Sequence, residues 1–124
     1  MKTLFFIPFL FMCSIVIGQS SVIIGTPIKI GNLEVAQNDF PKRMTWIEAK
    51  KACANLGSGW RLPTKDELNL MYKNRKKIGG FEINRFWSST ESSSTNAWGQ
   101  GFYNGAQNYY PKDYNASVRA VRAF

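Results

Sequence analysis

The sequence predicts an α+β domain in which two helices pack on a small, mostly antiparallel sheet. Between residues 45 and 76, the apolar residues recur at helical spacing in two stretches, and each stretch begins with a capping motif. From Phe81 to Phe124 the composition changes to serine, asparagine, glycine and aromatic residues, which is typical of short strands and loops. Asn104-Gly105 in that second part is the strongest hairpin signal in the chain.

The first 18 residues have the pattern of a secretory signal. Lys2 supplies the positive start, and the apolar run Leu4–Ile17 is too short to favour a membrane span. Small or branched residues near position 18 place the expected cleavage before Gln19. We therefore expect a secreted protein, periplasmic or extracellular, that keeps no membrane span after cleavage.

The domain itself is predicted to cover residues 28–124, after a loose lead-in at residues 19–27. Ile28–Ala36 alternates as a strand does and contains Gly31-Asn32, which predicts a hairpin or a bulge. The 106 residues that follow the signal are enough for one modest domain.

The first helix is expected to begin after Thr45. Glu48 lies three residues further on and completes a capping box, and Gly57 ends the helix after about Leu56. One helical stripe is predicted to face the core and contains Trp46, Ala49, Cys53 and Leu56.

The stretch from Gly59 to Leu68 organises the rest of the chain. Pro63 forces Leu62 toward extended geometry, so no helix runs through this point. Thr64 and Glu67 then form a second capping box, which predicts a helix over about Lys65–Lys76.

Arg61 lies within this stretch, between two apolar anchors. We expect it to pair with a carboxylate, Glu91 or Glu67 first, because an unpaired buried charge is costly. We also expect Trp46, Trp60 and Trp87 to meet in one core.

The second half of the chain is predicted to form the larger part of the sheet. One strand covers Phe86–Thr90, and the polar loop Glu91–Asn96 follows it. The remaining strands are expected at Ala97–Tyr103, Ala106–Tyr110 and Ala116–Phe124. Trp98, Gln100 and Phe102 share one face of their strand because side chains alternate.

Composition excludes several kinds of chemistry. The chain has no histidine, which rules out Ser-His and Cys-His nucleophiles and zinc sites with imidazole ligands. Cys13 leaves with the signal, so Cys53 can form no internal disulfide and is interpreted as a small buried hydrophobe. The adjacent pair Asp66-Glu67 is accounted for by a helix start. We therefore expect no catalytic residues, no metal ligands and no cofactor.

The net charge favours an anionic partner. It is +8 for the whole chain and +7 without Lys2. For an exported protein this indicates an acidic polysaccharide or a membrane surface rather than nucleic acid. The densest basic run contributes the candidate anion-binding residues Lys73, Arg75, Lys76 and Lys77. The alternative is that these residues complement the helix dipole and keep the surface soluble.

Five motifs occur in the order typical of one family. They are Thr45-Trp46-x-Glu48-Ala49-x-x-x-Cys53-x-x-Leu56-Gly57, Gly59-Trp60-Arg61-Leu62-Pro63-Thr64-x-x-Glu67-Leu68, Phe86-Trp87-Ser88-Ser89-Thr90-Glu91, Ala97-Trp98 and Val118-Arg119-Ala120-Val121-Arg122. Together they resemble the Lcl C-terminal domain family and the similar major paralogous domains of exported bacterial proteins. The resemblance covers about residues 28–124. It implies a C-type-lectin-like fold, related to the formylglycine-generating enzymes, and the adhesin that names the family binds sulfated glycosaminoglycans.

The departures from related families limit what this resemblance implies. Calcium-dependent lectins recognise sugars with Glu-Pro-Asn and Trp-Asn-Asp motifs, and the chain contains neither. The oxidase-type relatives need two active-site cysteines, and only Cys53 is in position. Neither calcium-dependent sugar binding nor formylglycine chemistry carries over, and a binding module remains.

The stretch from Trp98 to Asn115 combines tyrosine with small amides, as binding loops do. We assign Trp98 and Phe102 to the core. The residues expected on an exposed ligand-binding face are Tyr103, Asn104, Asn108, Tyr109, Tyr110, Lys112, Tyr114 and Asn115.

Three hypotheses for function stay open. The first is an exported glycan-binding or polyanion-binding domain, adhesin-like and independent of calcium. The second is a receptor for protein or cell-surface ligands, because the segment between Trp98 and Val118 resembles the part that retroelements diversify in some members of this fold class. The third is an enzyme of unknown reaction, although no catalytic constellation is visible in the sequence.

Overall fold

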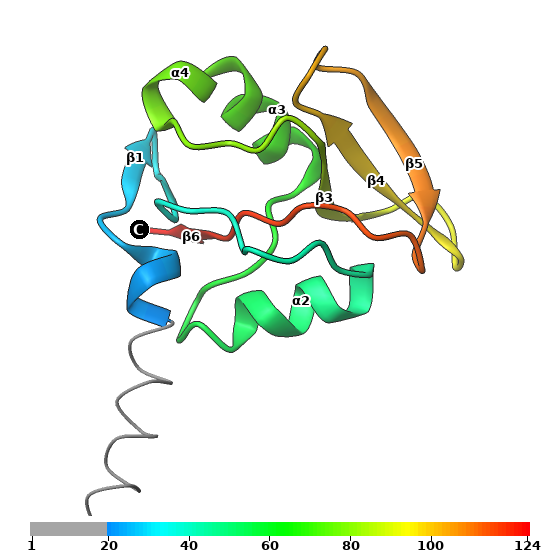
Figure 1. The fold of residues 1–124 in the computed structure, drawn as a ribbon, viewed down its shortest axis with the longest axis horizontal. Coiled ribbons are helices and arrows are strands. Elements are labelled where there is room, and N and C mark those ends of the chain that lie inside the picture. The colour runs from blue at the N-terminus through cyan, green and yellow to red at the C-terminus, as the bar shows by residue number, and fades with distance from the viewer. Residues whose placement is uncertain (1–19) are drawn as a thin grey trace, which may run out of the picture.

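The computed structural model describes residues 20–124, and the predicted signal at residues 1–18 lies outside that range (Figure 1). The described part is an α+β domain with helices packed around two small antiparallel sheets. None of its helices is long and apolar enough to cross a membrane.

Two three-stranded sheets form in residues 20–124, where the sequence predicted one. The first has the order β1-β2-β6 and contains β1 (Ile28–Ile30), β2 (Leu33–Val35) and β6 (Val121–Ala123). The second has the order β3-β4-β5 and contains β3 (Arg85–Glu91), β4 (Asn96–Gly101) and β5 (Gln107–Pro111). All strand pairs within the sheets are antiparallel, and the hairpins predicted at Gly31-Asn32 and at Asn104-Gly105 are confirmed.

The closing strand is shorter than predicted, and its approach explains why there are two sheets. Residues 116–120 run between the sheets, and their backbone groups bond to several different segments in turn. Ala116 pairs with Met44, and the carbonyl oxygen of Ala120 accepts from the N–H of Ala36. Ser117 forms an isolated parallel bridge with Phe86 of β3. The segment therefore links the two sheets instead of belonging to one of them.

Both predicted capping boxes are confirmed. Thr45 caps α2 (Trp46–Ala54) and Thr64 caps α3 (Lys65–Lys73), each with the glutamate three residues later. The second helix stops sooner than predicted, because Asn74 leaves helical geometry at φ −105° and the chain restarts as α4 (Arg75–Ile78). Figure 1 shows α2 on one side of β6, with α3 and α4 on the other.

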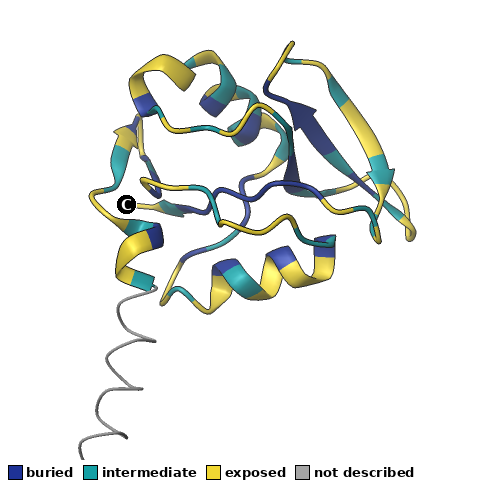
Figure 2. Ribbon diagram, viewed as in Figure 1, coloured by how far each residue is buried: buried dark blue, intermediate teal, exposed yellow. Residues whose placement is uncertain are grey.

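The buried residues of the described part form two clusters, and Figure 2 marks the buried positions along the ribbon in dark blue. The first contains Trp46, Trp60 and Trp87, which confirms that these three rings share one core. Cys53 lies in the same cluster as a fully buried free thiol, and burial raises its pKa to about 12. In the second cluster, Leu68 and Met71 of α3 pack with Phe86 of β3 and with buried residues of β1, β2 and β6.

The lead-in is more ordered than expected. Residues 20–24 are helical, and Ile23 is buried. The backbone N–H groups of Gln37 and Asn38 donate to the carbonyl oxygens of Ile24 and Ile23, respectively. This segment therefore packs on the domain.

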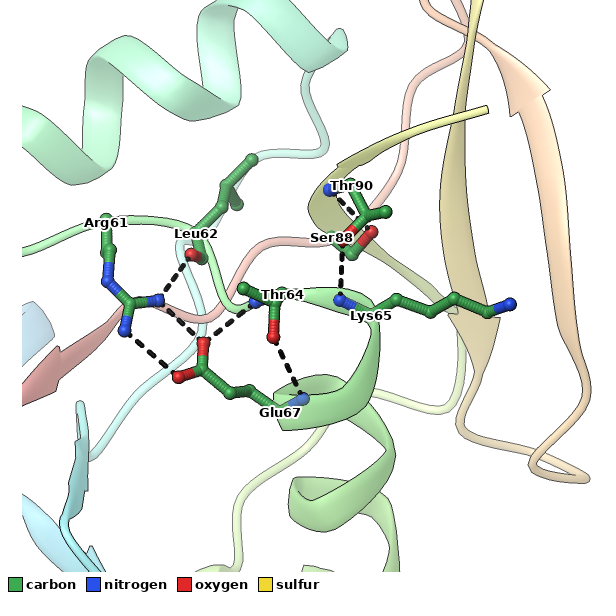
Figure 3. A network of polar contacts seen from close by, with 7 residues as sticks. All are labelled: Arg61, Leu62, Thr64, Lys65, Glu67, Ser88 and Thr90. Atoms are coloured by element: carbon green, nitrogen blue, oxygen red, sulfur yellow. Dashed lines mark hydrogen bonds and ion pairs between the residues drawn. The ribbon is translucent and has the colours of Figure 1, made fainter. Parts of the chain in front are cut away.

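Arg61 pairs with Glu67, the second of the two predicted carboxylates (Figure 3). Its Nη1 and Nη2 donate to the two carboxylate oxygens at 2.6 and 3.0 Å, and this holds the pKa of Glu67 below its ordinary value. The Glu67 carboxylate also accepts from the N–H of Thr64, so one side chain closes both the ion pair and the helix cap. The Arg61 side chain is 42% exposed and that of Glu67 26%, so the pair is partly buried, as the sequence suggested.

Candidate functional site

An open groove of about 530 Å³ lies beside the β3–β4–β5 sheet. Its walls come from the end of β3, the loop that follows it, two residues of β4 and one residue of β5. The lining residues are Glu91, Ser92, Ser93, Asn96, Trp98 and Tyr109. Two large rings and several short polar side chains thus meet at a concave surface, as in many ligand-binding sites.

Two aromatic rings form one wall of this groove. Trp98 of β4 and Tyr109 of β5 are direct cross-strand partners, which places their side chains on the same face of the sheet. Their ring centroids are 5.5 Å apart and the planes meet at 85°. Tyr109 is 58% exposed, so much of its ring is free to contact a ligand.

A lysine from α3 contacts the same aromatic pair. The Nζ of Lys65 lies 3.6 Å from the ring centroid of Trp98, a cation–π contact. The backbone explains this position, because the N–H of Lys65 donates to Thr90 Oγ1 and ties the start of α3 to β3. Figure 3 shows the Lys65 side chain extending from that point toward the β3–β4–β5 sheet. The groove therefore has a positive charge against its largest ring.

Lys112 holds the loop between β3 and β4 in place. Its Nζ donates to Glu91 Oε2 at 2.6 Å and to the carbonyl oxygen of Ser94 at 2.9 Å. The hydrogen bond from Lys112 holds the pKa of Glu91 below its ordinary value. Within the loop, Ser93 Oγ accepts from the N–H groups of Thr95 and Asn96. These contacts organise the rim before any ligand arrives.

Amide side chains on the groove face fasten the β4–β5 hairpin to α3. Gln100, which is fully buried, donates to Asn69 Oδ1 at 3.0 Å. Gln107 donates to the carbonyl oxygen of Lys65 and to Gln100 Oε1. Hydrogen bonds depend on the orientation of both partners, so this network fixes the position of the hairpin relative to Lys65, the residue that contacts Trp98.

The opposite face of the hairpin is filled rather than open. Tyr110 stacks on Tyr114 at 5.4 Å and meets Trp87 edge-on. It covers Gly99, where a Cβ atom would lie only 3.2 Å from the Tyr110 ring. Tyr110 and Tyr114 are half-buried because they pack against the tryptophan core.

The predicted binding face is therefore divided between two faces of one hairpin. Tyr109 lies on the groove face, whereas Tyr103, Tyr110 and Tyr114 lie on the other, around Arg85. Tyr103 and the predicted asparagines, Asn104, Asn108 and Asn115, are exposed as expected. Tyr110, Lys112 and Tyr114 are not, and the Lys112 ammonium already binds Glu91.

Two further outcomes concern residues that the sequence placed elsewhere. Phe102 is buried as expected, but Trp98 is only half-buried and lines the groove. Four other groove residues were not predicted from the sequence: Glu91, Ser92, Ser93 and Asn96. The signal that could have found Trp98 is its position opposite Tyr109 in a hairpin centred on Asn104-Gly105.

The predicted basic cluster lies on α3 and α4. Lys73, Lys76 and Lys77 are exposed, while Arg75 stacks on the Tyr72 ring at 4.1 Å and donates to the Tyr72 carbonyl oxygen. None of these residues lines the groove. Their role in anion binding stays a prediction.

Comparison with known proteins gives a family match over most of the chain. The sequence model described as the Lcl C-terminal domain matches residues 30–122. No curated protein sequence matches the chain.

Among solved structures, similar ones include C-type-lectin-like snake venom proteins. Botrocetin superposes with a TM-score of 0.62 at 10% identity, covering 81% of this chain and 98% of its own. Botrocetin in complex with the von Willebrand factor A1 domain gives 0.59 at 10% identity, with the same coverage of both chains. EMS16, an antagonist of the collagen receptor integrin α2β1, gives 0.59 at 12% identity and covers 79% of this chain and 97% of its own. At these identities the likeness establishes a C-type-lectin-like fold.

Proposed function

The chain belongs to the Lcl C-terminal domain family, and from that premise we propose that it is an exported, non-catalytic domain that binds a glycan through the Trp98–Tyr109 groove without calcium. Export rests on the signal pattern in residues 1–18. The observation that carries the binding proposal is the perpendicular pair of rings, half-buried Trp98 and exposed Tyr109, in a polar-rimmed groove.

The groove suits a sugar for two physical reasons. Sugar rings have apolar C–H faces that pack on aromatic rings, and the exposed ring of Tyr109 offers such a surface at little entropic cost. Sugar hydroxyls need donors and acceptors at the rim, and Ser92, Ser93 and Asn96 supply both. Stacking thus provides contact area, while the short polar side chains provide selectivity.

The proposal that binding is independent of calcium rests on Glu91, the carboxylate that lines the groove and is already hydrogen-bonded to Lys112. Calcium sites in proteins assemble several oxygen ligands, usually with more than one carboxylate. The groove is lined by one carboxylate, Glu91, whose Oε2 is bonded to Lys112. Binding by stacking and neutral hydrogen bonds needs no metal ion.

A protein partner is the second candidate, and one observation favours it. Botrocetin is found in complex with the von Willebrand factor A1 domain, and EMS16 antagonises an integrin. A tyrosine-rich surface fits partner side chains as well as sugars. In that case the ligand would be a folded cell-surface protein without attached sugar.

The test is binding of the purified full chain to a glycan array, followed by affinity measurement for the strongest hit. Trp98→Ala and Tyr109→Ala should each weaken binding about tenfold or more, since each removes a central aromatic contact. Phe124→Ala is the matched control, because Phe124 is an aromatic residue of similar exposure, 56%, beside β6 of the other sheet. Affinity should be the same with and without a calcium chelator.

Two conditions separate the ligand classes. A sulfated or otherwise anionic glycan should bind much more weakly at high salt, whereas a neutral one should be nearly insensitive to salt. An array without hits, combined with binding to a deglycosylated cell-surface protein, would replace the glycan proposal with the protein one. Full binding by both groove variants, or loss of binding in chelator, would contradict the proposal itself.

A further inference from the structure

Arg85 differs from the other arginines in how its charge is satisfied. Four of the six arginines pair with a carboxylate: Arg43, Arg61, Arg119 and Arg122. Arg75 donates to a backbone carbonyl oxygen. Arg85 donates from Nη1 to the hydroxyl of Tyr114 at 2.8 Å and has no carboxylate partner within residues 20–124.

The guanidinium group of Arg85 is enclosed by aromatic rings. Its Cζ lies 5.1 Å from the ring centroid of Tyr110, 5.8 Å from that of Tyr114 and 6.0 Å from that of Tyr103. The rings come from β5, from the connector after it and from the hairpin turn before it. Such a cage holds the planar group in one orientation and lowers the entropy that binding would otherwise cost.

One edge of this guanidinium is left without an acceptor. Among the buried side-chain nitrogen and oxygen atoms of residues 20–124, the Nε of Arg85 is the one that lacks a hydrogen-bond partner. An unsatisfied buried donor is costly, so its persistence calls for an explanation such as a missing partner. With Nη1 committed to Tyr114, the Nε and Nη2 groups remain as two parallel donors, the arrangement that matches a planar carboxylate.

The backbone of β4 is shaped to allow this cage. Gly101 pairs with Arg85 across the sheet, and a Cβ atom at Gly101 would lie 2.9 Å from the Tyr103 ring. A glycine therefore lets Tyr103 lie close to the strand, beside Arg85. Tyr103 is still 52% exposed, so it can move aside and admit a ligand.

We propose that Arg85, framed by Tyr103, Tyr110 and Tyr114, is a second binding site that takes the carboxylate of an acidic sugar. The carboxylate accepts from Nε and Nη2 of Arg85, and the exposed ring of Tyr103 packs against the sugar. This site lies on the face of the hairpin opposite the Trp98–Tyr109 groove. It does not depend on the groove, and it would remain if the groove bound nothing.

The acidic sugar is favoured over an acidic peptide by what surrounds the cation. The neighbours are tyrosine rings and the exposed amide of Asn104, next to Tyr103. Aromatic rings and amides together suit a hydroxyl-rich ring that also carries a charge. Binding of a peptide carboxylate is the alternative, and the experiment distinguishes it from binding of an acidic sugar.

The experiment is a titration of the ¹⁵N-labelled full chain with glucuronate, followed through the Nε–H resonance of Arg85. Glucuronate should shift this resonance, and glucose should not. Arg85→Lys keeps the charge but loses the fork, and should weaken glucuronate binding about tenfold or more. Arg122→Lys is the matched control, because Arg122 also lies over an aromatic ring, that of Trp60, but already pairs with Glu34, and this variant should bind glucuronate as the wild type does.

Four outcomes would overturn the proposal. They are an unshifted Arg85 resonance, wild-type affinity in a folded Arg85→Lys variant, tighter binding of inorganic sulfate, and tighter binding of N-acetylglutamate. If the Arg85 variants do not fold, Tyr103→Ala serves instead, since it removes the exposed ring that packs against the sugar. Weaker glucuronate binding by that variant would support the site, and unchanged binding would count against it.

Discussion

The two faces of the β4–β5 hairpin use the same ingredients with opposite results. Each face combines a cation with aromatic rings: Lys65 with Trp98 and Tyr109 on one, Arg85 with a group of tyrosines on the other. The first face is an open groove, whereas Tyr110 on the second is packed against Trp87. The difference comes from β4, which alternates a large and a small residue at successive positions.

Trp98 and Gln100 project toward α3 and the groove, while Gly99 and Gly101 face the tyrosines. On the face where β4 carries large side chains, the Tyr109 ring of β5 has no space to pack against the strand and stays exposed. Where β4 carries glycine, a tyrosine ring lies directly against the strand. Which face of a hairpin is available for binding is thus decided by the strand next to the tyrosines as much as by the tyrosines themselves.

The largest expected contrast is between two adjacent tyrosines. Tyr110→Ala should lower the free energy of unfolding by about 3 kcal/mol, because it removes a ring packed on Trp87 and Tyr114. Tyr109→Ala should change it by less than about 0.5 kcal/mol, because that ring is mostly exposed. Urea unfolding of the two variants measures both values, and equal losses would show that the faces are not packed differently.

A smaller contrast should separate two glycines of β4. A Cβ atom at Gly99 would lie 2.8 Å from the backbone carbonyl oxygen of Phe86, so Gly99→Ala should cost about 1–3 kcal/mol. The Cβ atom of Gly101→Ala would instead meet the ring of Tyr103, which is exposed and can rotate away. We expect that variant to lose less stability in thermal unfolding while Tyr103 changes its environment. A more damaging Gly101→Ala would contradict this description of the filled face.

The smallest expected effect concerns pH at the groove. The pKa of Glu91 is below its ordinary value of 4.5, so the contact with Lys112 is present above that pH and weakens as pH falls through the lowered value. The loop should then loosen, and ligand affinity at the groove should fall below about pH 4.5. Glu91→Gln should bind more weakly at neutral pH and show a flatter profile. Identical pH profiles for that variant and the wild type would remove Glu91 from the explanation.

Local signals in the sequence predicted the helical half well. Thr45 with Glu48, and Thr64 with Glu67, determine helix starts through contacts three residues apart, so no distant information is needed. The pairing of Arg61 with Glu67 was within reach for the same reason, because the two residues are close in sequence.

The remaining features depend on residues far apart in the chain. The buried guanidinium of Arg119 binds Asp39 across 80 positions, and nothing near either residue announces the pair. The division of the tyrosines between two faces was different, since strand alternation alone separates Tyr109 from Tyr110. The two faces could therefore have been predicted from the sequence, but the residues were grouped by their composition instead of by their alternation along the strand.

The path of residues 116–121 has a consequence for how the protein is made. These residues supply backbone partners to Phe40, Met44, Arg61 and Trp87, all of which leave the ribosome well before them. The tryptophan core and β2 therefore wait for the last part of the domain before their ladders can close. Pairings over such distances slow folding, because the chain must close long loops before it gains the contacts. Until then, newly synthesised chains expose the residues of their tryptophan core, and this is the state of the protein that chaperones would bind.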